Sequence, residues 1–350
     1  MGKAITIGDR TISPGENTYI IGEMACAHQG EVAQAEQLVD AIAAAKADCV
    51  QLQIFQPEAN MVPTADLYST LEQLHFTPAI WQSLADRARN ADCQVSIFVY
   101  DEPSLDIGLS VKPDLLKLNS SELSNPPLVK ATAESGLPFT LGTGSSTFEE
   151  IAKALSIIDA AGAGDRVILA HGVQNFPTPI EEANINRIGL LQQSFGRPVM
   201  FADHTSGDHA LATAIDLVAL GAGAVLLEKH VTLDRGAQGV DWQAALEPGE
   251  FSTYVYTMRV GASSLGPNQP MPLNASDAKY RRFQKKSVVA RRDLTAGSEL
   301  TAKDVVFLRV QGPQEGIAPA DFDRFAGWRL RRDMPAYGQL FPHDLLPPEA

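Results

Sequence analysis

The sequence predicts an α/β protein, in which a closed barrel of eight strand–helix units is followed by a small second domain. Short apolar runs alternate with segments long enough to be helices, which is typical of parallel strands joined by helices. Histidines closely follow two of the later runs, at the strand ends where a barrel carries its active site. The 350 residues are enough for a barrel of about 250 residues and one further domain.

Eight apolar runs are predicted to be the barrel strands. Most are bounded by glycine or by polar residues that favour turns. In chain order they are Thr18–Gly22, Cys49–Phe55, Gln94–Tyr100, Leu115–Leu118, Phe139–Gly142, Arg166–Ala170, Pro198–Ala202 and Ala224–Leu227. Short strands with a helical segment between most neighbours favour a closed barrel.

Helix-length segments follow six of these strands. They are Glu31–Ala47, Pro78–Asn90, Pro126–Ser135, Thr147–Ala160, Ile180–Phe195 and Gly249–Gly261. The fourth has the clearest start, because Ser146 or Thr147 can cap it and two glutamates occupy its first turn, where the helix dipole favours acids.

The composition changes near residue 265, which predicts three parts. Residues 1–264 form the barrel domain, and residues 265–285 form a linker, since Gly266–Pro272 is rich in proline. Residues 286–350 form a small β-rich domain that begins with the run Ser287–Ala290. This last part contains too few apolar residues for an independent core, so we expect it to pack on another surface.

Charge and cysteine content exclude several classes of function. A formal net charge of −14 argues against nucleic acid and anionic membranes as partners, because both favour basic surfaces. No apolar run reaches membrane length, and the first residues do not resemble a signal peptide. Cys26, Cys49 and Cys93 fit neither a disulfide framework nor a zinc motif, so we expect a cytoplasmic protein in which Cys26 is a buried thiol.

His204 and His230 are the first candidates for a functional site. They lie at the ends of two successive predicted strands, so a barrel brings them together. Imidazoles in that place bind metals or transfer protons. The structural alternative is that each histidine caps a helix or completes a hydrogen bond.

Further motifs run in a fixed order through nearly the whole chain. They are Gly22-Glu23, Leu116-Lys117, Phe176–Pro179, Asp203–Thr205, Glu228–His230, Leu246–Pro248, Ser287–Ala290, Ala296-Gly297 and Gly316-Ile317. In this order they resemble the sialic acid (N-acetylneuraminate) synthase family. The resemblance implies a (β/α)8 TIM barrel with a C-terminal antifreeze-like (SAF) domain. It also implies a metal-assisted condensation of phosphoenolpyruvate with an N-acylated amino sugar, or its phosphate, to a nonulosonic acid.

The resemblance also implies roles for single residues. His204 and His230 match the family's ligands for a divalent metal such as Mn²⁺, Co²⁺ or Mg²⁺. The catalytic or sugar-contacting carboxylates implied are Glu23, Glu122 and Asp241. Trp242 replaces the histidine that follows this aspartate in the family. Arg291 and Arg292 are the candidates for a tail arginine that holds the acyl group.

The donor site departs most from the family. Lys117 and Ser120 match residues that hold phosphoenolpyruvate, and Gln174 occupies an amide position. Gln51 replaces a second lysine, and hydroxyl-bearing positions have become Phe98, Gly142 and Ala202. Each lost charge-assisted contact costs about 1.5–3 kcal/mol. Either other residues, such as His28 or His171, complete a phosphate site, or the donor is not phosphoenolpyruvate.

Three functions stay open at this point. The first is the family condensation, and the second is a metal-dependent aldolase or lyase with another donor such as pyruvate, in which Lys117 could form a Schiff base. The third is a non-catalytic sugar-binding barrel. The resemblance further implies a homodimer in which the small domain reaches over the partner's active site, an arrangement that domain swapping provides at low cost.

Overall fold

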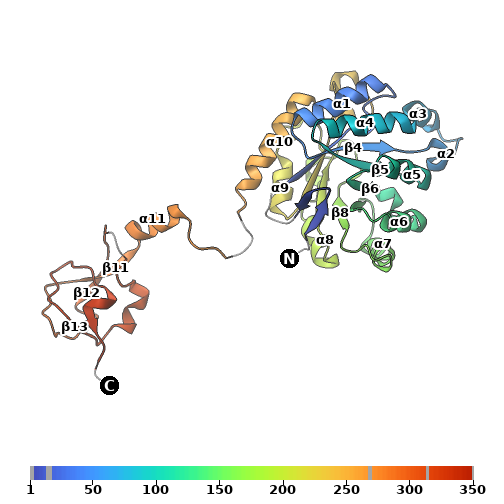
Figure 1. Ribbon diagram of the computed structural model, residues 1–350. Coiled ribbons are helices and arrows are strands. Elements are labelled where there is room, and N and C mark those ends of the chain that lie inside the picture. Colours follow the sequence, from blue (N-terminus) through green and yellow to red (C-terminus); the bar gives the residue numbers. More distant parts are fainter. Residues whose placement is uncertain (1–3, 13–17, 267–269, 313–314, 349–350) are drawn as a thin grey trace. The chain divides into compact units, whose positions relative to one another are not determined.

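The computed structural model describes residues 4–12, 18–266, 270–312 and 315–348. The chain divides into two compact units, Met1–Asn268 and Gln269–Ala350 (Figure 1). The first unit is an α/β barrel, and the second contains short antiparallel strands and one helix.

The barrel consists of eight parallel strands that pair in chain order and close between β10 and β3. The strands are β3 (Tyr19–Glu23), β4 (Cys49–Ile54), β5 (Gln94–Val99), β6 (Leu115–Leu118), β7 (Phe139–Gly142), β8 (Val167–His171), β9 (Val199–Asp203) and β10 (Leu226–His230). The predicted (β/α)8 fold is therefore confirmed. Both faces of these strands are buried, which is why the strands appear in the sequence as mainly apolar runs.

Helices surround the barrel (Figure 1). They are α1 (Val32–Ala44), α2 (Pro57–Asn60), α3 (Tyr68–Leu74), α4 (Pro78–Asn90), α5 (Glu102–Ser110), α6 (Pro126–Glu134), α7 (Phe148–Ala160), α8 (Arg187–Phe195), α9 (Ile215–Gly221) and α10 (Pro248–Ser263). Thr147, one of the two residues predicted to cap this helix, caps α7. Glu150 completes a reciprocal capping box with it. Within the described part of the chain, no helix is both long and apolar enough to cross a membrane.

A hairpin that the sequence analysis did not predict closes the amino-terminal end of the barrel. Its strands β1 (Ile5–Ile7) and β2 (Arg10–Ile12) are only three residues long. Their isoleucines share a buried cluster with residues near the beginnings of the barrel strands, including Tyr19 and Leu115. The carboxyl ends of the strands, where His204 and His230 lie, are at the opposite end.

The second unit has a small core of its own, so the expectation that it lacks one is wrong. Its strands are β11 (Lys286–Ala290), β12 (Val305–Arg309), β13 (Arg329–Leu330) and β14 (Leu345–Leu346). Buried residues between Val288 and Leu345 form one cluster, which includes Leu300 and Leu340. Helix α11 (Ala275–Gln284) occupies part of the range predicted as linker, because Asn274 caps its first turn.

This core is assembled from two similar halves. Arg292 donates a hydrogen bond to Asp304, and Arg332 donates one to Asp344, forty residues further along. The halves also exchange contacts, because the backbone N–H of Ala296 donates to Asp333 and that of Ala336 donates to Asp293. Two short segments thus cover each other, which compensates for the small number of apolar residues.

Candidate active site

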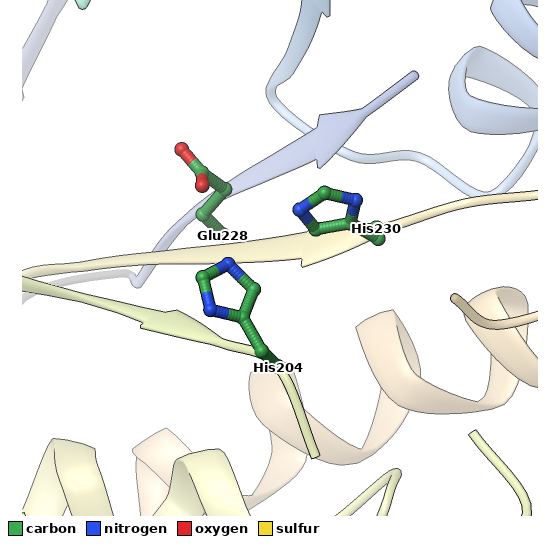
Figure 2. A group of neighbouring side chains, drawn as sticks. All are labelled: His204, Glu228 and His230. Atoms are coloured by element: carbon green, nitrogen blue, oxygen red, sulfur yellow. The ribbon is translucent and has the colours of Figure 1, made fainter. Parts of the chain in front are cut away.

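Three potential metal ligands meet at the carboxyl end of the barrel. His204 directly follows β9, while Glu228 and His230 lie on β10 (Figure 2). One ligand atom from each lies within 4.8 Å of the others, and all three residues are buried. Glu228 and His230 share the inner face because side chains alternate along a strand. Two imidazoles and a carboxylate are a ligand set suited to Mn²⁺, Co²⁺ or Zn²⁺.

The hydrogen bonds and the pKa values of the histidines fit metal binding. The Nδ1 atom of His204 lies 2.6 Å from the carbonyl oxygen of Val173. A carbonyl only accepts, so Nδ1 carries the proton and Nε2 keeps a free lone pair. Burial lowers the pKa of both His204 and His230 to about 4. Both rings are therefore neutral at neutral pH, which is the form that binds a metal.

Glu228 is a candidate metal ligand to which the sequence analysis assigned no role. Its Oε1 atom lies 2.5 Å from the Nζ atom of Lys117, and its Oε2 atom accepts a hydrogen bond from Gln51 at 3.0 Å. Burial, together with the nearby charge of Glu23, raises the pKa of Glu228 to about 7. The predicted strand Ala224–Leu227 stops one residue before Glu228, whereas β10 continues to His230. A strand carried on through Glu-x-His could have identified Glu228, because residues two apart on a strand face the same side.

Glu23 connects the ligand group to the rest of the site. It is the last residue of β3, and its Oε2 atom lies 3.1 Å from Lys117 Nζ and 3.6 Å from His230 Nε2. The carboxylate is almost completely buried. It can accept a proton from a substrate held between it and the histidines.

These groups surround a pocket of about 390 Å³. The predicted site residues that line it are Glu23, Lys117, Ser120, Gln174, His204, His230 and Asp241. Asp241 has a left-handed backbone with φ of 59°, and burial raises its pKa. Cys26, predicted as a buried thiol, also lines the pocket and donates a hydrogen bond to Gln53. Residues far apart in the sequence thus form one cavity.

Two other predicted residues of the barrel, Gln51 and Glu122, lie outside the lining of this pocket. Gln51 is fully buried and donates a hydrogen bond to Glu228. Glu122 lies on a 3-10 turn, η1 (Ser120–Ser124), where it accepts hydrogen bonds from Ser121 and Asn125. Arg291, in the second unit, donates a hydrogen bond to the backbone of Val305.

The two histidines considered as replacement phosphate ligands also lie elsewhere. His171 Nε2 lies 2.9 Å from the carbonyl oxygen of Ala183. His28 is fully buried, its ring 4.4 Å from that of Phe76 and 6.2 Å from that of Trp81. Neither histidine lines the pocket.

The burial of His28 predicts that the stability of the folded protein depends on pH. Burial lowers its pKa to about 4, well below the value of about 6.5 in an unfolded chain. The unfolded state therefore takes up a proton first, so stability falls as the pH drops from about 6.5 to about 4, by about 3 kcal/mol from this residue. Urea denaturation at pH 7 and pH 4.5 should show a smaller loss for His28→Phe than for the wild type. An equal loss would contradict this assignment.

The fold and the site define a (β/α)8-barrel protein with a candidate metal site and neighbouring acid–base groups. The NeuB family model matches residues 38–269, and the SAF domain model matches residues 285–346. The chain belongs to the NeuB family and ends in a SAF domain.

Individual relatives agree with this assignment. The N,N'-diacetyllegionaminic acid synthase of Legionella pneumophila is 27% identical, over 91% of this chain and 92% of that one. The pseudaminic acid synthase of Helicobacter pylori is 25% identical, over 93% and 97%. The crystal structure of an N-acetylneuraminic acid synthetase from Leptospira borgpetersenii, in complex with citrate, is 27% identical with a TM-score of 0.75, and the match covers 81% of this chain and 98% of that one. The chain is thus an enzyme of carbohydrate biosynthesis, from a family that makes sialic-acid-like sugars.

Proposed function

We propose that this enzyme joins a three-carbon, enol-forming donor to the carbonyl carbon of an N-acylated amino sugar, giving a nonulosonic acid. The observation that carries the proposal is that His204 and His230, which with Glu228 form the candidate metal ligands, line one pocket together with Glu23 and Lys117. The relatives whose names give a product are synthases of sialic, legionaminic or pseudaminic acids, which supports this type of product.

A divalent metal held by His204, Glu228 and His230 would act as a Lewis acid toward the sugar carbonyl. Glu23 transfers protons at the reacting carbon, because its carboxylate lies beside both Lys117 and His230. Lys117 neutralises negative charge at the donor. The neutral polar groups of Ser120 and Gln174, with the carboxyl of Asp241, bind substrate oxygens.

Arg291 or Arg292 is the expected contact of the sugar's acyl group, and Glu122 is expected to act as a catalytic or sugar-contacting carboxylate, as the family resemblance implies. We propose a homodimer in which the second unit covers the partner's barrel. Charge supports this arrangement, because acidic residues outnumber basic ones about two to one in the first unit, whereas basic residues are in excess in the second. A stable monomer in light scattering would exclude it.

The test of the function is formation of a new acid. The metal-loaded protein is incubated with phosphoenolpyruvate or pyruvate and a panel of N-acylated hexosamines and their phosphates, and mass spectrometry follows the products. We expect a nonulosonic acid with at least one donor and one acceptor. Binding of sugars by the folded, Mn²⁺-loaded protein without any product would favour the non-catalytic alternative.

The Schiff-base alternative has little support. Lys117 is held between two carboxylates, and although burial alone would lower its pKa, Glu228 and Glu23 outweigh that effect and raise it. A Schiff base needs the neutral amine. A covalent adduct trapped by borohydride with pyruvate would reverse this conclusion.

A further inference from the structure

The pocket has an apolar floor beside the candidate metal ligands. Phe98, Gly142, Ala170 and Ala202, near the ends of four strands, line this part of it. None of their side chains carries a hydrogen-bonding group. The ring of Phe98 stacks on that of Tyr100 with centroids 4.6 Å apart. A phosphate group placed here would meet carbon where it needs hydrogen-bond donors.

Backbone geometry enforces part of this floor. A Cβ atom at Gly142 would lie 2.4 Å from the backbone nitrogen of Ser120 and 2.9 Å from the carbonyl carbon of Asn119. Both atoms belong to the main chain, so no side-chain rotation relieves the clash. A hydroxyl-bearing side chain does not fit at position 142 unless the whole turn moves.

Lys117 is the only lysine or arginine among the described residues that line the pocket, and its charge is already compensated. Its Nζ atom lies 2.5 Å from Glu228 and 3.1 Å from Glu23. It also lies 4.3 Å from the ring centroid of Phe98. An anionic group of a substrate must therefore compete with these two carboxylates for the ammonium group of Lys117.

The amide of Gln51, which lies beside Glu228, is also occupied. Gln51 donates to Glu228 at 3.0 Å and accepts a hydrogen bond from Ser96 at 3.1 Å. Asp241 adds another carboxyl group to the pocket. The described lining from the barrel therefore offers no further cation to a donor that carries both a phosphate and a carboxylate.

We propose that the donor is an unphosphorylated 2-oxo acid of the pyruvate class, a conclusion that rests on the proposed function above. Such a donor carries one negative charge, and its methyl group suits the apolar floor. A C–H bond of the methyl group breaks, and the proton passes to Glu23. The former methyl carbon of the donor then forms a bond with the sugar's carbonyl carbon. The sugar's carbonyl oxygen takes up the proton from Glu23. No group leaves, so the product contains all atoms of both substrates.

The first half of this reaction can be tested without a sugar. Pyruvate is incubated in D2O with the Mn²⁺-loaded protein, and mass spectrometry measures deuterium uptake into the methyl group. We expect uptake by the wild type and a loss of at least about 100-fold in Glu23→Gln. Glu149→Gln is the matched control, because this side chain is 79% exposed on α7 and should leave exchange unchanged. No exchange by the folded, metal-loaded wild type would overturn the proposal.

Two further results separate this proposal from the proposed function. Phosphate release from phosphoenolpyruvate with an amino sugar, without pyruvate exchange, would overturn the donor assignment and leave the condensation standing. Exchange without a product from any acceptor would support the donor assignment and remove the condensation.

Calorimetry of the Mn²⁺-loaded protein provides a measurement independent of turnover. We expect pyruvate to bind more tightly than phosphoenolpyruvate. We also expect no tighter binding of phosphoenolpyruvate by Gln51→Lys, because that lysine would be buried beside Lys117 and would lose the hydrogen bond from Gln51 to Glu228. A ten- to hundredfold gain, roughly the effect of one added charge-assisted contact, would overturn the proposal.

Discussion

The His230→Ala variant is expected to bind Mn²⁺ at least about 100-fold more weakly than the wild type and to lose turnover on the order of a thousandfold. The substitution leaves one histidine and Glu228 of the three potential ligands. Glu228 is already engaged by Lys117 and Gln51, so it cannot compensate by moving freely toward the ion. Without a Lewis acid the sugar carbonyl is no longer activated.

Calorimetric titration with Mn²⁺ on both proteins measures the loss, and a thermal melt confirms that the variant is folded. His209→Ala is the control, because His209 is exposed on the loop after β9 and lies outside the ligand group. Unchanged Mn²⁺ affinity in folded His230→Ala would show that these residues do not form a metal site.

The barrel could be predicted because its signal is local. Strands buried on both faces appear as apolar runs, and α4, β6 and β7 begin and end at the predicted residues. Elements without such a signal were missed. The strands β1 and β2 are too short to show periodicity, and α9 begins after a loop without a side-chain cap. In the second unit, the small core depends on pairing between segments forty residues apart, which no single window reveals.

The site could be predicted only in part, for the same reason. The positions of His204 and His230 follow from strand ends, and that of Glu228 follows from strand alternation. The ion pairs of Lys117 could not be predicted in this way, because Glu23 and Glu228 are 94 and 111 residues away from it in the sequence. Sequence therefore located the two histidines but neither Glu228 as a candidate ligand nor its pairing with Lys117.

A second buried network lies behind the candidate metal ligands. Lys229, between Glu228 and His230, alternates to the outer face of β10 and is fully buried there. It forms ion pairs with Asp203 and, at 3.6 Å, with Asp216. Burial alone would lower its pKa, but the two carboxylates outweigh this effect and raise it. Because Asp203 precedes His204 and Lys229 precedes His230, this ion pair ties together the ends of β9 and β10.

The Lys229→Met variant is therefore expected to lose about 3–5 kcal/mol of unfolding free energy, because Asp203 and Asp216 remain buried without their cation. Lys153→Met is the matched control, since Lys153 pairs with Glu149 at 2.8 Å on the surface, with its side chain 72% exposed, and should change stability by less than about 1 kcal/mol. Urea denaturation at pH 7 measures both. Mn²⁺ affinity should fall in Lys229→Met, because the strand ends that carry the histidines lose their connection. Equal stability of the two variants would mean that solvent or rearrangement compensates the buried carboxylates, and that the ion pair does not position the ligands.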